Sequence, residues 1–513
     1  MTESANRRWV LLAVVSAGLL LITLDNSILY AALPTLVEEL GANSSESLWI
    51  INAYPVVMAG LLLGSGTLGD RVGHRRMFLI GLGVFGGASL AAAFSPNPEA
   101  LIAARAFLAV GAASMMPATL ALISITFDDE RERNFAIAIW GTLAIVGSAL
   151  GPIISGVLLE SFWWGSVFII NVPVVIVAAV ATLVLAPAND PDPSKRWDLR
   201  SSLLALVTLV GVVVAIKEVA KTTRSPVIIA VALLAAVAGG WAFKRRQREL
   251  DYPLLVFAIF RNRGFLAGVL AAGFSLFAIA GIQLITTQRF QLVEGYSPLG
   301  AGLLVAAVAL GALPTAVVGG AILHRAGLLS IVTGGLAVAT GGAILILLNF
   351  DTHMGLLVTG LLVTGAGLGA VMSVASSAIM GNVEPRRAGM ASSVEEVSYE
   401  FGSLTAVALL GSLLTAVYTA TIDLPAGVPA AARDSLDSAL ALAHGGPEPD
   451  TALIAAASDA FDGAYLAVMI VVAAVLAVGA VLTGVLLRRH GPGSPLSGHP
   501  TPKPRPGSVH ANQ

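Results

Sequence analysis

The segment "LITLDNSILYAALP" (residues 21–34) places one carboxylate, Asp25, inside an apolar run that extends from Trp9 to Pro34. Of the 513 residues, 56% are hydrophobic and 12% are charged, and the mean hydropathy is +0.85, as in integral membrane proteins. The run lacks a small-residue cleavage site, so we expect a retained helix rather than a signal peptide. Because an ionised side chain at membrane depth costs several kcal/mol, Asp25 is a candidate functional residue.

Fourteen apolar runs follow one another along the chain. A hydrocarbon core about 30 Å thick is crossed by roughly 20 helical residues, and the runs lack the alternation of membrane β-barrel strands. We therefore predict an all-α membrane protein with fourteen transmembrane helices. The predicted spans are 9–33, 48–68, 77–94, 100–126, 134–159, 166–188, 200–220, 226–243, 264–287, 298–322, 328–349, 354–380, 391–418 and 464–487.

The basic residues predict the orientation of the chain. If the amino terminus is cytoplasmic, 23 of the 29 Lys and Arg residues fall on the cytoplasmic side, five fall outside, and Arg105 lies within a helix. The five outer residues are Lys217, Lys221, Arg224, Arg289 and Arg433. We therefore expect both termini in the cytoplasm.

The two ends of the chain show weak internal repetition, which is common in transporters built from duplicated halves. The stretch "GTLGDRVG" (66–73) aligns with "GAILHRAG" (320–327) at an offset of 254 residues, and Arg133 aligns with Arg387 at the same offset. We therefore expect four parts: an amino-terminal six-helix bundle (1–195), two inserted helices with a cytoplasmic basic loop (196–262), a carboxy-terminal six-helix bundle (263–490) with an outer loop at 421–463, and a disordered cytoplasmic tail (491–513).

Several motifs in chain order resemble the signatures of one transporter family. The stretch "GTLGDRVGHRRM" (66–77) resembles the loop signature of the major facilitator superfamily, and "LDNSILYAALP" (24–34) resembles the first-helix signature of its fourteen-helix drug/proton antiporters. Further similar motifs are "RAFLAVGAASMMPATLALI" (105–123), "GSALGPIISGVL" (147–158) and "VEEVSYEFG" (394–402). The resemblance implies a major facilitator fold in the cytoplasmic membrane. Asn52 stands where multidrug members often carry an acid, which favours monocationic over dicationic substrates.

The loop signature predicts a cytoplasmic gate formed by Gly66, Gly69, Asp70, Arg71, Gly73 and Arg75. Asp70 falls at the carboxyl end of a helix, where the helix dipole disfavours a second negative charge, so it needs an outside partner. The resemblance implies that Asp70 meets the amino end of a helix in the other bundle. Arg71 and Arg75 are expected to pair with neighbouring acids such as Asp128 or Asp129. The alternative is that the loop forms no gate and that its basic residues only fix the orientation of the chain in the membrane.

The predicted helix 134–159 carries small residues at four-residue spacing, which allows close helix packing. These are Gly147, Gly151 and Ser155, with Gly156 beside them, and Pro152 permits a bend. The resemblance implies a hinge that favours antiport over symport, while ordinary membrane-helix packing is the alternative.

Two intramembrane charges are expected to share one polar cluster. At a rise of 1.5 Å per residue, Asp25 lies about 12 Å from the outer end of its helix, and Arg105 lies about 8 Å below the outer end of its own. The alternatives are that Arg105 extends to the interface and that Asp25 is only its structural partner.

The predicted helix 391–418 carries three glutamates, Glu395, Glu396 and Glu400. Glu396 and Glu400 are four residues apart and share a face, while Glu395 points about 100° away. Glu400 is expected near the membrane midplane, about 13 Å from the cytoplasmic end. We therefore predict a proton- and substrate-binding set of Asp25, Arg105, Glu396 and Glu400, in which the two glutamates titrate as one coupled site. The alternative is that Ser, Tyr or backbone groups cap the glutamates.

The outer segment from Thr421 to Gly463 contains two alanine-rich stretches, "AARDSLDSALALA" (431–443) and "DTALIAAASDAF" (450–461). The intervening "HGGPEP" (444–449) contains Gly and Pro, which stop helices. We expect a short helical hairpin over the external mouth.

These features predict a secondary transporter rather than an enzyme: a proton-coupled antiporter that exports lipophilic cationic drugs, dyes or antiseptics. No Gly-rich phosphate loop follows a strand, and the absence of cysteine excludes thiolate metal sites, so we expect no cofactor and no metal. The expected partners are small lipophilic monocations, protons and the lipid bilayer, without nucleic acid and with a monomeric chain. The alternative on the same fold is an exporter of a neutral or anionic natural product, lipid or amino acid. A receptor would be expected to carry a soluble output domain. A channel would be expected to lack the gate signature.

Overall fold

The structure is a computed structural model. It describes residues 2–127, 129–193, 197–220, 224–250, 253–383, 388–425, 427–445 and 449–489, and every regular element in these ranges is a helix. Several predicted features therefore lie outside the described residues: Asp128, Lys195, Arg196, Lys221, Arg386, Arg387 and the tail 491–513.

The helices follow the predicted apolar runs closely. The first part contains α1 (Thr2–Leu40), α2 (Ser44–Val72), α3 (His74–Ala93), α4 (Pro98–Thr126), α5 (Glu130–Ser161), α6 (Ser166–Ile169) and α7 (Asn171–Leu185). The pair α8 (Leu199–Ala220) and α9 (Pro226–Glu249) follows. The last part contains η1 (Phe257–Arg261), α10 (Arg263–Leu292), α11 (Pro298–Asn349), α12 (Met354–Met380), α13 (Ala388–Thr421), η3 (Ala430–Arg433), α14 (Leu436–His444) and α15 (Thr451–Leu487).

Within the described ranges, twelve helices are long and apolar enough to cross a membrane. Helix α2 is bent by 61° between two arms, Ser44–Leu62 and Gly64–Val72. If the two arms count as one span, α2 is the thirteenth membrane-crossing helix. The remaining predicted run lies on α5, whose apolar part, Val146–Ser161, is shorter. Length and composition thus support twelve or thirteen crossings directly, and the predicted all-α membrane fold is confirmed.

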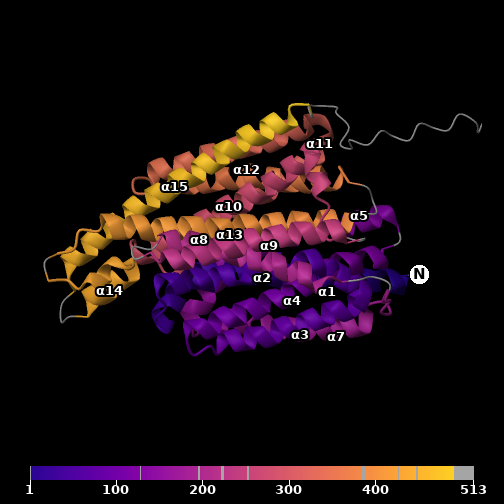
Figure 1. Cartoon of the computed structure of the whole chain (residues 1–513), viewed down its shortest axis with the longest axis horizontal. Helices are drawn as coiled ribbons and strands as arrows, with labels where there is room; N and C mark the ends of the chain where they lie inside the picture. The colour runs from indigo at the N-terminus through magenta and orange to yellow at the C-terminus, as the bar shows by residue number, and fades with distance from the viewer. Residues whose placement is uncertain are drawn as a thin grey trace, which may run out of the picture.

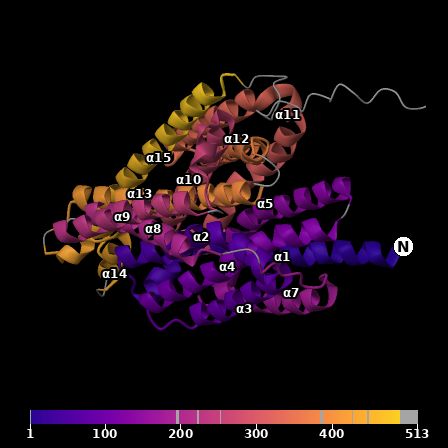
Figure 2. The ribbon, with the colours of Figure 1, turned by 45° about the vertical axis from the view of Figure 1, so that its right-hand side comes forward.

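Two groups of helices lie side by side, with α8 and α9 along the seam between them (Figure 1). Helices α1 to α7 form one group and α10 to α15 the other, and Figure 2 shows the same separation from a second direction. The groups touch where α2 packs on α13 and where α5 packs on α11. Helix α8 contacts both groups through a buried apolar cluster of Val56, Val213, Leu404 and Ala408. The inserted pair therefore covers the seam.

The two glycines that the internal repeat aligns have the same unusual backbone. Gly73 joins α2 to α3 at φ 94°, and Gly327, 254 residues later, lies at φ 76° inside α11. Gly327 separates the two predicted spans 298–322 and 328–349, which run on as one assigned helix with a kink. Because side chains clash at positive φ, both junctions require glycine.

The outer segment differs from the predicted hairpin in its second arm. The first arm is α14, which follows η3 and ends at His444. The second arm is the beginning of α15, which runs without a break from Thr451 to Leu487. Both alanine-rich stretches are thus helical as predicted, but the second arm continues into the last transmembrane span because nothing between residues 451 and 464 stops a helix. Ser44 Oγ donates to Asp434 O (3.0 Å) and Tyr418 Oη donates to Ala432 O (3.1 Å), so the segment is fixed over the outer ends of α2 and α13.

Replacing Gly73 or Gly327 by Ala is expected to lower the free energy of unfolding by about 1–2 kcal/mol, because each Ala would have to adopt a left-handed backbone. Gly83→Ala on α3 is the matched control, since nothing lies within 4 Å of a Cβ at that position. The measurement is thermal unfolding of the purified protein in detergent. Equal melting temperatures for all three variants would contradict the assigned backbone.

Candidate functional site

Asp25 on α1 and Arg105 on α4 form a buried ion pair. Asp25 is 1% exposed and Arg105 is 0% exposed, and Arg105 Nη1 donates to Asp25 Oδ2. Arg105 Nε donates to Ile50 O (3.3 Å), and Arg105 Cζ lies 4.7 Å from the ring centroid of Tyr54. The predicted meeting of the two charges is confirmed. The alternative in which Arg105 extends to the interface is wrong, because its side chain is fully enclosed.

A third partner, Asn171, was not among the predicted site residues. Asn171 begins α7, and its Nδ2 donates to Asp25 Oδ1 (3.0 Å) and to Ser89 Oγ (3.3 Å). Both oxygens of the Asp25 carboxylate therefore accept a hydrogen bond, which a buried ion requires. The available sequence signal was a lone amide at the start of the apolar run "NVPVVIVAAV" (171–180).

On α13, Glu395 is the glutamate with hydrogen-bond donors. Its side chain is buried, Ser376 Oγ donates to Oε2 (3.2 Å), and Tyr399 Oη donates to Oε1 at the limit of a hydrogen bond (3.5 Å). The alternative in which Ser and Tyr cap the glutamates thus holds for Glu395. This residue points toward α12, away from the face that Glu396 and Glu400 share.

Glu400 differs from Glu395 because one of its oxygens is enclosed without a donor. Among the described residues, nothing donates a hydrogen bond to the buried Oε2 atom. Glu396 and Arg105 both lie within electrostatic reach of Glu400. Since Arg105 belongs to the other helix group, the α13 carboxylate and the Asp25–Arg105 pair flank the same part of the seam.

Two tyrosines lie near these charges. Tyr30 and Tyr54 are buried, and both are within electrostatic reach of Glu400 and Arg105. Tyr30 Oη forms a hydrogen bond with Ser403 Oγ (3.1 Å), which joins α1 to α13. The arrangement thus places one satisfied carboxylate and one carboxylate with an unpaired oxygen on opposite sides of the seam, with two buried tyrosines near them.

The gate signature contacts its own helix group. Asp70 Oδ1 lies 3.1 Å from His74 Nε2, and Asp70 O accepts from Asp192 N (2.9 Å). Arg75 Nη2 donates to Leu183 O (2.6 Å), while Asp129 caps α5 by accepting from Glu132 N (2.9 Å). Among the described residues, Asp70 has no contact with the other bundle and Arg75 does not pair with Asp129, while the expected partner Asp128 and residues 384–387 just before α13 lie outside the described residues. Carbonyls at a helix end lack partners within the helix, so the last turn of α7 attracts Arg75 instead.

The remaining residues of the gate signature are Arg71 and three glycines, and the glycines differ in how closely their neighbours approach. Arg71 is exposed, and a Cβ on Gly66 would touch only Pro117, at 4.0 Å. A Cβ on Gly69 would lie 3.1 Å from His74 Nδ1. The close approach expected of the glycines occurs at Gly73, against the side chain of Asn189. Asn189 Nδ2 also donates to Val72 O (2.9 Å), so the loop after α7 is fixed to the α2–α3 turn.

The small residues of α5 allow close packing on two different helices. A Cβ on Gly147 would lie 3.1 Å from Thr23 Cβ, and one on Gly151 would lie 2.9 Å from Ile28 N, so both glycines face α1 beside Asp25. A Cβ on Gly156 would instead collide with the backbone of Leu299 on α11, and Pro152 O is close to Gly302. Helix α5 thus contacts the Asp25 helix at one point and the other helix group at the next.

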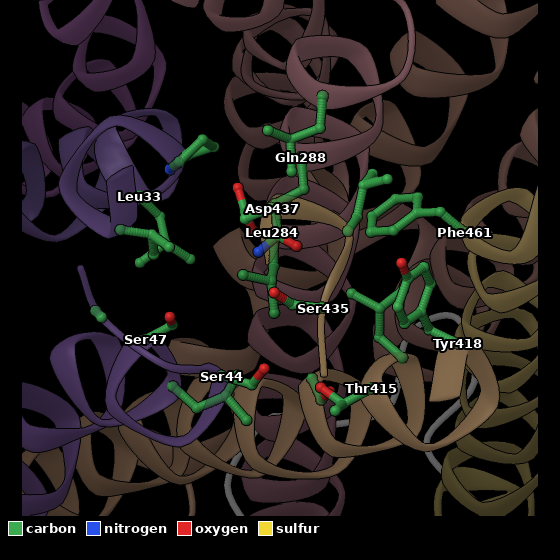
Figure 3. Close-up of a pocket in the computed structure, with 18 of the residues that line it drawn as sticks. Leu33, Ser44, Ser47, Leu284, Gln288, Thr415, Tyr418, Ser435, Asp437 and Phe461 are labelled. Atoms are coloured by element: carbon green, nitrogen blue, oxygen red, sulfur yellow. The ribbon is translucent and has the colours of Figure 1, made fainter. Parts of the chain in front are cut away.

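A small cavity at the outer mouth lies beneath the segment that leads into α14. Its volume is about 60 Å³, enough for about two water molecules and too small for a drug. Figure 3 shows side chains from both groups around it, among them Leu33, Gln288, Thr415 and Asp437. Burial, with a contribution from the negative charge of Glu38, raises the pKa of Asp437 to about 6. The outer ends of the two groups therefore meet around a small cavity with both polar and apolar lining.

A sequence model described as Major Facilitator Superfamily matches residues 15–407. The multidrug efflux pump LfrA of Mycolicibacterium smegmatis is 36% identical over 498 residues, which are 95% of this chain and 98% of LfrA. The methyl viologen resistance protein SmvA of Salmonella typhimurium is 34% identical, with 89% of this chain and 93% of SmvA aligned.

A solved structure shares the fold at low sequence identity. It is the crystal structure of a bacterial homolog to the human lysosomal transporter Spinster, in an inward-facing and unoccupied conformation. The TM-score is 0.63 at 14% identity, and the match covers 95% of this chain and 99% of the other.

Arg105→Gln is expected to lower the free energy of unfolding by about 3–5 kcal/mol, because it leaves the Asp25 carboxylate buried without its counter-ion. Adding Asp25→Asn should restore part of that loss, since the lone charge is then removed. The measurement is a double-mutant cycle of thermal unfolding in detergent. Additive losses in the double variant would show that the two side chains do not depend on each other.

Proposed function

The chain belongs to the major facilitator superfamily, and from this premise we propose that it is a proton-coupled antiporter that exports lipophilic monovalent cations. The observation that carries the proposal is the enclosed Glu400 Oε2 atom, which has no donor among the described residues and lies within electrostatic reach of Arg105. A buried carboxylate without a partner is stabilised by a proton or by a cation. The similarity to LfrA, a multidrug efflux pump, and to SmvA, a methyl viologen resistance protein, supports export.

Exchange follows if proton and substrate compete for Glu400 and its neighbour Glu396. A cation that enters from the cytoplasm displaces a proton from the pair, and a proton that arrives from outside displaces the cation. Neither step leaves an ionised carboxylate buried alone, so the carboxylates are compensated in both states. The site lies at the seam of the two helix groups, where transporters commonly bind their substrates.

Asp25 has a different role in this scheme. Its carboxylate already accepts hydrogen bonds from Arg105 and Asn171, so a substrate cation would stabilise it little further. We propose that protonation of Asp25 frees Arg105 and thereby changes the field at Glu400. Asp25 thus senses protons, whereas the α13 pair binds substrate.

The driving force depends on the number of protons exchanged. One proton per monocation is electroneutral and uses only the pH gradient, about 1.4 kcal/mol per unit. A second proton adds one net charge, about 2.3 kcal/mol per 100 mV of membrane potential. A carboxylate on each side of the seam favours more than one proton, and no cofactor is needed.

The preference for singly charged substrates is inferred from Asn52. Its side chain is fully buried, and both of its polar atoms lack hydrogen-bond partners among the described residues. A neutral amide at this position offers a second positive charge no counter-ion, which favours monocations. SmvA is a resistance protein for methyl viologen, a dication. The proposal therefore implies that this chain and SmvA differ in the charge of their substrates.

We propose that the protein lies in the cytoplasmic membrane as a monomer, with both termini in the cytoplasm. Its moving parts are the bundles 1–195 and 263–490, with 196–262 along the seam. The asymmetry of the basic residues supports the orientation, and the glycines and Pro152 of α5 support a bend where the bundles meet.

Glu400→Gln is expected to abolish export of monovalent cations while sparing some neutral substrates, because the amide cannot balance a cation. Asp25→Asn should abolish pH-driven export of every substrate and leave dye binding intact. The measurements are dye binding and efflux driven by a pH gradient in proteoliposomes.

Glu395→Gln is the matched control for Glu400→Gln, because it removes a buried carboxylate little more than one turn away on α13, from the face that Ser376 and Tyr399 occupy. Its efflux should stay within a few-fold of the unmodified protein. Cation export by Glu400→Gln at the normal rate would overturn the proposed role, as would loss of binding in Asp25→Asn.

Asp70→Asn is expected to leave the protein folded and inserted but to slow transport, because it removes a charge of the cytoplasmic loop and no group near Glu400. The measurement is initial efflux rate at equal expression, with substrate binding as the second readout. Unchanged efflux would remove Asp70 from the gate and leave its ion pair with His74 as a local contact.

A further inference from the structure

A groove between α8 and α9 opens at the end of the pair that carries the basic residues. Its volume is about 410 Å³, and its lining includes Leu203, Val207 and Trp241 along the walls, with Arg200, Arg245 and Glu249 at the rim. The wall side chains are largely uncovered by protein, at 47%, 46% and 62% exposure respectively. Helices α8 and α9 are also the least buried spans of the molecule, at 28% and 17%. The groove therefore faces lipid.

One face of α9 changes from apolar to basic at the groove. Val227, Val231, Leu234 and Trp241 recur at helical spacing and are 44% or more exposed, and Arg245 follows one turn after Trp241. Arg245 Cζ lies 5.6 Å from the Trp241 ring centroid. Tryptophan and arginine in this order are typical of the depth at which a bilayer passes from hydrocarbon to headgroups.

The opposite face of α9 is fixed to the protein. Phe243 and Gln247 are buried, and Gln247 Nε2 donates to Ser201 Oγ (2.6 Å). Arg246 donates to both carboxylate oxygens of Asp198 (2.6 and 2.8 Å), and these bonds hold the pKa of Asp198 below its usual range. Arg246 is thus neutralised near neutral pH and serves to join the two helices.

Arg200 and Arg245 are the two exposed arginines at the rim, and Arg245 pairs with Glu249 through one nitrogen only. Arg200 is exposed in the first turn of α8. Arg245 uses its Nε for Glu249 Oε1 (2.9 Å), and a guanidinium carries four further N–H donors on its two Nη atoms. Lys244 and Arg248 are exposed nearby but do not line the groove. Apolar walls that lead up to guanidinium groups with unused N–H donors match a molecule with acyl chains and an anionic headgroup.

We propose that this groove binds an anionic phospholipid, with the phosphate at Arg200 and Arg245 and an acyl chain along Leu203, Val207 and Trp241. The bound lipid would lie where α8 meets α9, the pair that covers the seam between the two helix groups. The site does not depend on the transported substrate, and only the leaflet, the cytoplasmic one, follows from the proposed orientation.

The test is native mass spectrometry of the full-length protein in a neutral detergent with dioleoylphosphatidylglycerol or dioleoylphosphatidylcholine, which share acyl chains but differ in net charge. Phosphatidylglycerol is expected to bind at least about tenfold more tightly. Glycerol phosphate, which has the headgroup without chains, should not compete at equal concentration. Equal binding of the two lipids, or effective competition by glycerol phosphate, would overturn the proposal.

Two charge-matched double variants locate the site. Arg200→Gln with Arg245→Gln should weaken phosphatidylglycerol binding about 30-fold, since each basic side chain contributes roughly a factor of five. Lys244→Gln with Arg248→Gln removes the same charge from the neighbouring face and should change binding less than about threefold. Equal losses in both would mean that a general positive field attracts the lipid, which overturns a specific groove.

A third variant keeps every charge in place. Trp241→Ala removes the aromatic wall and should weaken phosphatidylglycerol binding severalfold without changing the preference over phosphatidylcholine. All of these side chains are exposed, so the melting temperature without lipid should not change. Unaltered lipid binding in Trp241→Ala, or a second copy of the chain in place of the lipid, would contradict the acyl-chain position.

Discussion

The buried ion pair between Asp25 and Arg105 is the interaction on which the rest of the arrangement depends. A charge at membrane depth persists only when it is paired and hydrogen-bonded. Here Arg105 joins α4 to α1 through Asp25 and to α2 through Ile50 O, and Asn171 adds α7. Four helices of one group are thus tied to one carboxylate. Glu400, on the other side of the seam, has no such set of donors among the described residues, and the proposed binding of a proton or a cation rests on this asymmetry.

The described hydrogen bonds between the two helix groups lie toward the outer side. Tyr30 pairs with Ser403, Gln291 Nε2 donates to Ala31 O (2.9 Å), and Ser44 donates to Asp434 O. Within the part of the chain that the structure describes, the contacts of the gate signature at the opposite end are with its own group. An outer side held together by hydrogen bonds suits substrate entry from the cytoplasm. The lipid groove on α8 and α9 lies on the pair that covers this seam.

Much of this could be predicted from the sequence, for identifiable reasons. The apolar runs and the rise of a helix place Asp25 and Arg105 at similar depths, and the family resemblance indicates which helices are neighbours. Spacing along one helix also separates Glu395 from Glu396 and Glu400. The partner Asn171 could not be predicted, because its contact depends on how α7 packs against α1. The contacts of Asp70 with His74 and of Arg75 with Leu183 O could not be predicted for a related reason: they depend on the conformation, which motifs do not specify.

The central claim is that proton and substrate compete for the carboxylates beside the seam. It is tested most directly by adding tetraphenylphosphonium, a lipophilic monocation, to the purified protein in weakly buffered detergent and recording the pH. The account predicts proton release that saturates together with binding, and an affinity that rises as the pH increases until the pair is deprotonated. Saturable binding without proton release, at an affinity independent of pH, would contradict it.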